Sequence, residues 1–254
     1  MENKFSKQPL LNVKVNNLTS KEALDCIESL VKSEKKSYVV AVNVDVIVKN
    51  DTDPYLNKII GDANIVLVDG MPLVWFSKIT NHPIIEKVSG SDIVPLVCKL
   101  AAKKGYSLFI LGGKSSVLNK AKENLEHSLP SIKIVGTYSP PIGFENNNEE
   151  IKKINEMINL SNPDFLIVCL GCPKQEKWIY ENYLKYNAKV SICAGATIDF
   201  LAGNIKRAPS WISKIGLEWF YRFMQEPKRL FKRYFIDDLK IFKICLSSII
   251  KRNQ

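Results

Sequence analysis

Six short apolar runs, each followed by turn residues, constrain the fold of this chain of 254 residues most strongly. Such runs are typical of strands buried on both faces of a sheet, and segments of helical length with charged faces lie between them. Alternation of this kind predicts a mainly parallel, Rossmann-like α/β sheet flanked by helices. The expected strands are 38–43, 64–69, 106–113, 132–138, 164–171 and 189–195, and the expected helices are 20–34, 51–62, 91–104, 115–128, 148–160 and 174–186.

Residues that are typical of helix starts and of loops support this assignment. Ser20 and Ser115 are expected to cap two of the helices. The segment 137–148 combines two prolines, a glycine and a run of asparagines, which predicts a long loop at the edge of a site.

The pattern changes after Gly203, where the strands stop and aromatic and cationic residues predict two or three short helices. From Ile205 onward the chain has twelve Lys and Arg but four Asp and Glu, so this segment carries +8 of the net charge of +10. We therefore expect an α/β core over residues 1–204 and a basic, aromatic helical appendage over residues 205–254. A local excess of this size implies an anionic partner.

Composition leaves three kinds of partner open for the appendage. Interfacial helices combine an aromatic and aliphatic face with cations that are attracted to anionic lipid. Nucleic-acid binders for single strands stack bases on aromatics beside cations, and a partner helix is the third kind. The aromatic residues in question, part of which we expect in the core, are Trp211, Trp219, Tyr221, Phe223, Phe231 and Phe235.

Composition also excludes several classes of protein. With 46% hydrophobic residues the chain can bury a large core, so intrinsic disorder is excluded. No apolar stretch approaches the roughly 20 residues that span a bilayer, and residues 1–13 lack the apolar segment of a signal peptide, so we expect a cytoplasmic protein. Cys169 and Cys172 form a CxxC without a second pair, which argues against a zinc site or a disulfide framework.

Polar residues at strand ends are the first candidates for chemistry, because ligands of open α/β sheets bind beyond the carboxyl ends of the strands. Asp69 closes one run and precedes Gly70, so its carboxylate can act as a general base towards an acceptor hydroxyl or can cap the helix that begins near Met71. Asn43 and Asp45 would be its neighbours if the strands are adjacent, although turn and cap roles are commoner for such residues.

Two glycine-rich turns also follow strands. Backbone amides there can face a phosphate or ribose, although neither turn has the spacing of a P-loop or of GxGxxG. Two such turns on one sheet edge favour a nucleotide, while the first turn of a helix in solvent is the commoner role for a single Lys or Gln. The residues are Gly112 and Gly113 in the first turn and Gly171, Pro173, Lys174 and Gln175 in the second.

Four segments together carry a family resemblance: VDGMPLVW, KVSGSD, GCPKQEKW and GATIDFLAGNIKRAPSWISKIGLEWFYRFMQEPKRLFKRY. They resemble the WecG/TagA/CpsF glycosyltransferases, glycosyltransferase family 26, and the resemblance extends from Val13 to Tyr234. It implies a catalytic core of the GT-E type and an inverting transfer of an N-acetylmannosamine-type sugar from a UDP-sugar. The implied acceptor is an undecaprenyl-diphosphate-linked sugar in teichoic acid, enterobacterial common antigen or capsule synthesis, and no metal or other cofactor is expected.

The resemblance also implies roles for individual residues. Asp69 falls on the proposed catalytic base, and Asn43 on an asparagine at the adjacent strand end. The arginines of the appendage are expected to bind the diphosphate, because a guanidinium binds phosphate oxygens bidentately. The further expected substrate or nucleotide contacts are Asp45, Gly70, Lys87, Asp92, Pro173, Lys174, Gln175, Glu176, Asp199, Arg222, Arg229 and Arg233.

Two departures from the family pattern bear on the substrate. Ala41 stands where the teichoic acid enzymes have threonine, and Lys87 stands where they have arginine, so transfer of another UDP-hexose, such as a glucosyl transfer in capsule synthesis, stays open. A nucleotide-binding oxidoreductase and a nucleic-acid-binding module are more remote alternatives. The expected partners are the UDP-sugar, the lipid-linked glycan, the anionic inner face of the cytoplasmic membrane through the appendage, and a homo-oligomer, but no nucleic acid.

Overall fold

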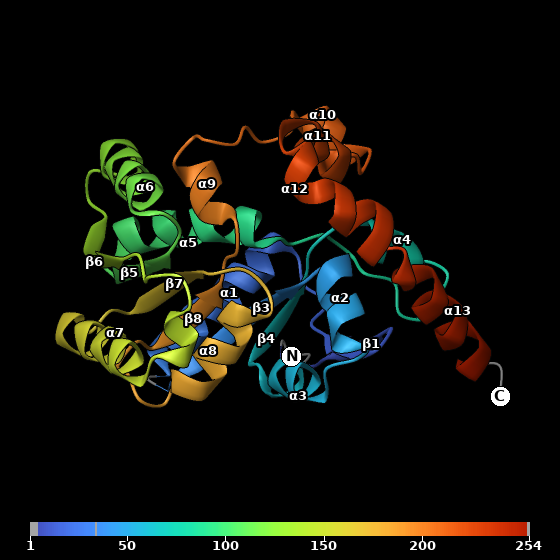
Figure 1. Ribbon diagram of the computed structural model, residues 1–254, viewed down its shortest axis with the longest axis horizontal. Helices are drawn as coiled ribbons and strands as arrows, with labels where there is room; N and C mark the ends of the chain where they lie inside the picture. The colour runs from blue at the N-terminus through green and yellow to red at the C-terminus, as the bar shows by residue number, and fades with distance from the viewer. Residues whose placement is uncertain (1–4, 34, 253–254) are drawn as a thin grey trace.

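A six-stranded parallel sheet forms the centre of the molecule, as the computed structural model shows for residues 5–33 and 35–252 (Figure 1). The strand order is β4-β3-β8-β7-β5-β6, and all pairs are parallel. Each observed strand falls inside one of the expected strands or extends at most one residue beyond it. The predicted fold class, a mainly parallel α/β sheet flanked by helices, is confirmed. The strands are β3 (Ser37–Val42), β4 (Ile65–Val68), β5 (Ser107–Gly112), β6 (Lys133–Tyr138), β7 (Phe165–Cys169) and β8 (Val190–Cys193).

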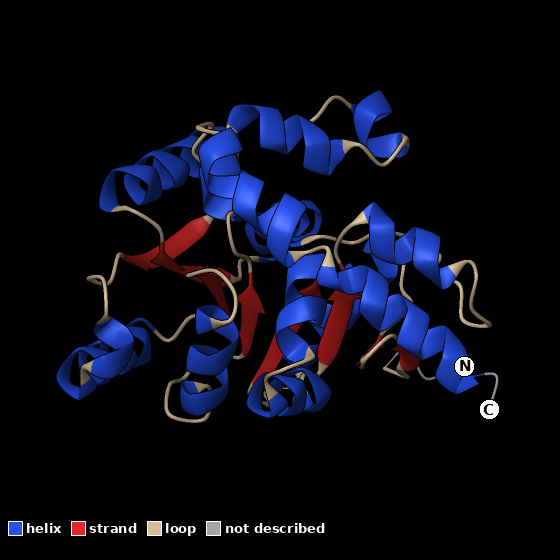
Figure 2. Cartoon of the chain, turned by 45° about the vertical axis from the view of Figure 1, so that its right-hand side comes forward, coloured by secondary structure: helices blue, strands red, loops and turns tan. Residues whose placement is uncertain are grey.

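Helices cover both faces of this sheet, so the core has three layers (Figure 2). Successive strand residues point to opposite faces, and Val39 and Val40 accordingly belong to two separate apolar clusters. One cluster contains side chains of α1 (Ser20–Lys32), α5 (Gly90–Lys104), α6 (Ser115–Ser128) and α9 (Thr197–Leu201). The other contains side chains of α2 (Val44–Asn50), α3 (Pro54–Asp62), α7 (Asn148–Ser161) and α8 (Lys174–Asn182).

Two of the expected helix caps are wrong by one residue. Thr19, not Ser20, caps α1, because its side chain accepts the N–H of Glu22 while the Glu22 carboxylate accepts the N–H of Thr19. Lys114 rather than Ser115 is at the cap position of α6, and it makes no side-chain cap hydrogen bond.

A short antiparallel hairpin covers one edge of the sheet. Its strands are β1 (Gln8–Leu10) and β2 (Val13–Val15), which the sequence analysis did not predict. Asn16 follows β2 and exchanges hydrogen bonds of 2.8 Å with the backbone of Val66 in the edge strand β4. Because this pairing uses free backbone groups of β4, it protects an otherwise open sheet edge.

Helices dominate the C-terminal part of the chain, as predicted (Figure 1). The last of them packs on α2, where the buried Ile244 joins the core cluster. Within the described residues, no helix is both long enough and apolar enough to cross a bilayer. The elements are α10 (Ser210–Lys214), α11 (Glu218–Gln225), α12 (Pro227–Lys232), a π-helical turn (Arg233–Asp237) and α13 (Lys240–Arg252); in the core, α4 (Met71–Ser77) and a 3-10 turn (Phe144–Asn146) complete the set.

Candidate active site

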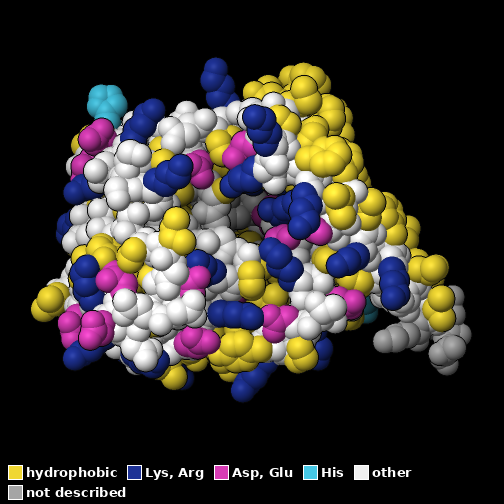
Figure 3. All heavy atoms as spheres, in the orientation of Figure 1, with side chains coloured by type: hydrophobic (Ala, Val, Ile, Leu, Met, Phe, Trp, Pro, Cys, Tyr) yellow, Lys and Arg dark blue, Asp and Glu magenta, His cyan; other side chains and the backbone are white. Residues whose placement is uncertain are grey.

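A cavity of about 300 Å³ lies where the carboxyl ends of the strands meet the C-terminal helices. Figure 3 shows the molecule hollowed near the centre of this face, with Lys and Arg side chains beside the hollow. The lining includes eleven residues that the sequence analysis singled out: Asn43, Asp45, Asp69, Gly113, Gly171, Gln175, Glu176, Asp199, Arg222, Arg229 and Arg233. The predicted side chains therefore converge on one site although they are distant in sequence.

Asp69 follows β4 and lines the cavity as a half-buried carboxylate. Its N–H donates to the carbonyl of Val42 at the end of β3 over 2.8 Å, which places the two strand ends side by side. The capping interpretation is wrong for Asp69, because Gly70 (φ 118°) occupies the cap position of α4 and that helix has no side-chain cap. The carboxylate is left to face the cavity.

Burial and neighbouring charges act on Asp69 in opposite directions. Removal of water raises the pKa of this carboxyl above its ordinary range, and the Lys87 ammonium counteracts the rise. Asp92 and Glu218 raise the pKa further, whereas Arg222 lowers it. A raised pKa suits a general base, since a carboxylate that binds a proton more tightly removes it from a hydroxyl more readily.

Asn43 combines a structural role with a place in the cavity. Its Oδ1 accepts the N–H of Val46 over 3.1 Å and so caps α2, which confirms the cap interpretation. The same oxygen lies 3.4 Å from a guanidinium nitrogen of Arg233. Asp45 in the first turn of α2 pairs with Lys49 at 2.8 Å and with Arg233 at 3.7 Å. These contacts attach the C-terminal segment to the core at the cavity wall.

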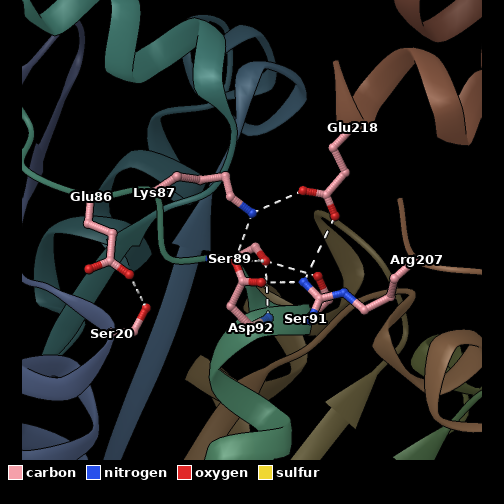
Figure 4. A network of polar contacts seen from close by, with 8 residues as sticks. All are labelled: Ser20, Glu86, Lys87, Ser89, Ser91, Asp92, Arg207 and Glu218. Carbon is pink, nitrogen blue, oxygen red and sulfur yellow. Dashed lines mark hydrogen bonds and ion pairs between the residues drawn. The ribbon is translucent and has the colours of Figure 1, made fainter. Parts of the chain in front are cut away.

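Lys87 and Asp92 lie outside the cavity lining that the described residues form, and they make a second attachment (Figure 4). Nζ of Lys87 lies 2.7 Å from Asp92 and 3.1 Å from Glu218 at the start of α11. Arg207 contacts Asp92 as well and lies 3.9 Å from Glu218. Burial raises the pKa of Asp92, but its contacts with Lys87, Ser89 and Arg207 together outweigh that effect and hold the pKa at about 2. Ser89 fixes Asp92 in turn, through a capping box at the start of α5.

Gln175 and Glu176 are buried, so a solvated first turn of α8 is the wrong interpretation for them. Oε1 of Gln175 accepts the N–H of Gly195 over 2.9 Å, and its Nε2 donates to Glu176 over 2.8 Å. The other oxygen of Glu176 has no hydrogen-bond partner among the described residues. Burial raises the pKa of Glu176, and the hydrogen bond from Gln175 counteracts the rise. The pair fixes the orientation of the Gln175 amide at the cavity.

Lys174, unlike Gln175 and Glu176, does not line the described cavity. Its ammonium pairs with Glu145 at 2.5 Å and lies 5.8 Å from the centre of the Phe144 ring, outside the described cavity lining. The prediction of a substrate contact at Lys174 therefore has no support in this geometry. Pro173, at the cap position of α8, is likewise outside the lining.

The two glycines at the end of β5, Gly112 and Gly113, have different roles. Gly112 has φ 106°, and a Cβ atom there would lie 2.5 Å from the carbonyl oxygen of Cys169 in the adjacent strand. This glycine is required for close packing of the two strand ends and is not part of the described lining, whereas Gly113 is.

Three arginines of the C-terminal helices line the opposite side of the cavity. Arg222 and Arg229 both pair with Glu226, at 3.6 Å and 2.6 Å, and Arg222 lies 5.6 Å above the ring of Phe200. Burial raises the pKa of Asp199, and Arg229 counteracts the rise more than Arg222 does. Three guanidinium groups around one cavity make a site for an anion such as a diphosphate.

Comparison with known proteins agrees with this geometry. The model of the Glycosyl transferase WecG/TagA/CpsF family matches residues 8–254. This chain belongs to that family. It is 33% identical over 215 residues to the N-acetylglucosaminyldiphosphoundecaprenol N-acetyl-beta-D-mannosaminyltransferase of Bacillus subtilis (strain 168), covering 84% of this chain and 81% of the relative. A protein of the same name from Bacillus spizizenii is 29% identical over 77% of this chain and 74% of the relative. One from Staphylococcus aureus (strain MW2) is 25% identical over 89% of this chain and 87% of the relative.

As a member of the WecG/TagA/CpsF family the chain is a glycosyltransferase, and its site contains residues that the sequence analysis missed. The turn after β8 contributes Gly195, Ala196 and Thr197 to the cavity, and the glycine directly after the apolar run could have indicated it. Arg207 and Glu218 had no comparable signal. Across residues 5–33 and 35–252, no three His, Cys, Asp or Glu side chains are grouped as metal ligands would be.

Proposed function

We propose that this glycosyltransferase moves an N-acetylmannosamine-type sugar from a UDP-sugar to an undecaprenyl-diphosphate-linked sugar, with inversion at the anomeric carbon. The observation that carries the proposal is the placement of Asp69 and of three arginines around the same cavity. Relatives that this chain matches over most of its length are named for such a transfer, and their printed name supports the proposed donor and acceptor.

In this reaction Asp69 takes the proton of the acceptor hydroxyl. The oxygen forms a bond to the anomeric carbon, the bond between that carbon and the UDP oxygen breaks, and UDP leaves with the electron pair. The raised pKa of Asp69 favours the proton transfer, and its position at the end of β4 keeps it on a rigid element.

Arg222, Arg229 and Arg233 hold the diphosphate of the donor. Negative charge grows on the UDP oxygen as the bond breaks, and guanidinium groups placed there in advance stabilise it. Asn43 orients a substrate hydroxyl or positions Arg233. Its Oδ1 accepts hydrogen bonds from the start of α2 and from Arg233. Gln175 and Asp199 supply further polar contacts to the nucleotide from α8 and α9, the helices that follow β7 and β8.

The C-terminal helices also bind the anionic face of the cytoplasmic membrane. Exposed apolar side chains run along them, as Figure 3 shows at the upper right of the molecule, over the tail helices of Figure 1. Exposed lysines, including Lys228, Lys232 and Lys240, accompany them. An apolar face with cations nearby fits an interfacial helix, so we place the enzyme at the inner face of the membrane as a peripheral protein.

Ala41 is the position that bears on the identity of the donor. It lines the cavity two residues before Asn43, where it offers a methyl group and no hydroxyl. A glucosyl or related transfer in capsule synthesis therefore stays the second candidate. Membership in a transferase family argues against the oxidoreductase and nucleic-acid-binding alternatives.

The test is UDP release by the purified protein with a panel of UDP-sugars, with and without a lipid-diphosphate sugar acceptor. We expect release that depends on the acceptor and is fastest with UDP-N-acetylmannosamine. Acceptor-dependent release with a different hexose would support the second candidate. Release that never depends on the acceptor would contradict the proposed transfer.

A further inference from the structure

α4 connects the candidate base to the surface of the molecule. It begins at Met71, two residues after Asp69, and carries Trp75, whose side chain is 43% exposed. The turn between α10 and α11 packs directly on this helix: a Cβ atom at Gly216 would lie 2.2 Å from the Trp75 ring and 3.0 Å from Cβ of Met71. Gly216 has φ 80°, so both the space and the backbone at this contact require glycine.

The contact leaves an apolar surface beside it. Ile215 and Leu217 flank Gly216 and are 54% and 39% exposed. We call Trp75, Ile215, Gly216 and Leu217 the α4 seam. Glu218 follows directly and pairs with Lys87 at 3.1 Å, and both residues act electrostatically on Asp69. Exposed apolar side chains, the cation Lys87 and the candidate base thus lie in one region of the molecule, around the starts of α4 and α11.

We propose that the α4 seam binds the first isoprene units of the acceptor's polyprenyl chain, and this proposal rests on the function proposed above. The acceptor in that function has an apolar chain, a diphosphate and a sugar, in that order. The seam, Lys87 and Asp69 provide matching chemistry in one region of the molecule. The seam lies on and beside α4, the helix that begins two residues after Asp69, and so offers the polyprenyl chain an apolar surface on the element next to the base.

General attachment to a membrane is a separate property, and the structure offers a matched control for it. Phe242 on α13 is 70% exposed, and α13 packs on α2. Its loss should weaken adhesion to vesicles without changing the recognition of a chain. Loss of Ile215 or Leu217 should change the recognition of a chain even where no membrane is present.

The experiment compares two acceptors with the same diphosphate and sugar in detergent, one with a full polyprenyl chain and one with a short water-soluble alkyl chain. For Ile215→Ser and Leu217→Ser, whose side chains flank the contact between Gly216 and Trp75, we expect KM for the long-chain acceptor to rise about tenfold, while kcat, the donor KM and the short-chain KM stay unchanged. Phe242→Ser should keep wild-type KM values for both acceptors and lose binding to vesicles of anionic phospholipid.

Unchanged preference for the long chain in both seam variants would overturn the proposal, and so would a wild-type enzyme that uses both acceptors equally. A photoreactive polyprenyl diphosphate gives a readout that does not need turnover. We expect it to label peptides of α4 and of residues 211–217, and labelling confined to α13 would overturn the proposal. If no donor is transferred to either acceptor but the seam is labelled, the proposed reaction fails and the lipid site stands.

Discussion

Nζ of Lys87 lies 3.1 Å from Oε2 of Glu218, although 131 positions separate the two residues in the chain. Lys87 follows the loop after α4, and Glu218 begins α11 in the C-terminal segment. Asp92 and Arg207 complete the network on both sides of this contact (Figure 4). Because Arg222 lies one helical turn after Glu218, the network also sets where that arginine meets the cavity. The contact that docks α11 on the core therefore also positions Arg222 at the cavity.

Loss of the Glu218 carboxylate should loosen this docking. Hydrogen bonds between charged groups contribute about 1.5–3 kcal/mol, so Glu218→Gln should shift the docking equilibrium by roughly tenfold or more. Hydrogen exchange should become faster in residues 210–226 and stay unchanged in the central strands. Glu126→Gln removes an exposed pair on α6 at 3.8 Å and should have no such effect. Equal exchange rates in both variants would show that the network does not hold the helices.

The fall of kcat/KM at low pH should depend on the charges around Asp69, because they change the pKa of this carboxyl. A base acts in its unprotonated form, so kcat/KM should rise with pH through the raised pKa of Asp69. Lys87→Met removes a charge that lowers this pKa, and its acid limb should move to higher pH. Glu218→Gln removes a charge that raises the pKa, and its acid limb should move to lower pH.

Glu149→Gln, on the exposed surface of α7, is the control and should leave the profile unchanged. Shifts of the same sign in the Lys87 and Glu218 variants would contradict the assignment of the limb to Asp69.

Glu176 should tolerate glutamine but not alanine. Glutamine has the shape of glutamate and keeps an oxygen that can accept the Gln175 amide, so Glu176→Gln should change the free energy of unfolding by less than about 1 kcal/mol and keep activity. Glu176→Ala leaves a space and an unpaired Nε2 on Gln175, and it should cost about 2–4 kcal/mol together with most of the activity. Denaturant unfolding of the two variants measures the difference. Destabilisation by glutamine as large as that by alanine would contradict this account of Glu176.

Gly112 and Gly203 have positive φ angles but different surroundings. Alanine at Gly112 would place Cβ 2.5 Å from a backbone oxygen, whereas nothing lies within 4 Å at Gly203, where φ is 72°. Gly203→Ala should therefore cost only the backbone term of about 1–2 kcal/mol. Gly112→Ala should cost a further 1–3 kcal/mol, on the order of an overpacked core. Thermal unfolding compares them, and equal losses would argue against the close approach of β5 and β7.

Four strands, β4, β5, β7 and β8, could be predicted because they are almost wholly buried and therefore continuously apolar, whereas the edge strand β6 is partly exposed. α2 could not: Val44, Val46 and Val48 are β-branched and favour strand, and the helix depends on the Asn43 cap and on packing against α13. β1 and β2, at three residues each, are too short to give a periodic signal.

The candidate site was predictable where a polar residue directly follows a strand, as Asp69 and Asn43 do. It was not predictable where the partner is distant in sequence. Arg207 reaches Asp92 across 115 positions, and no local pattern indicates that pairing. Lys174 is the opposite case. Its position in a motif predicts a substrate contact, but its ammonium pairs with Glu145 in the 3-10 turn before α7.

The most direct test of the account is single-turnover transfer by Asp69→Asn with saturating donor and acceptor. Asparagine keeps the size of the side chain but cannot take a proton, so we predict a rate lower by about 10²–10⁴, with UDP binding and the unfolding midpoint close to wild type. Transfer at the wild-type rate by a folded Asp69→Asn protein would contradict the role of Asp69 as the base.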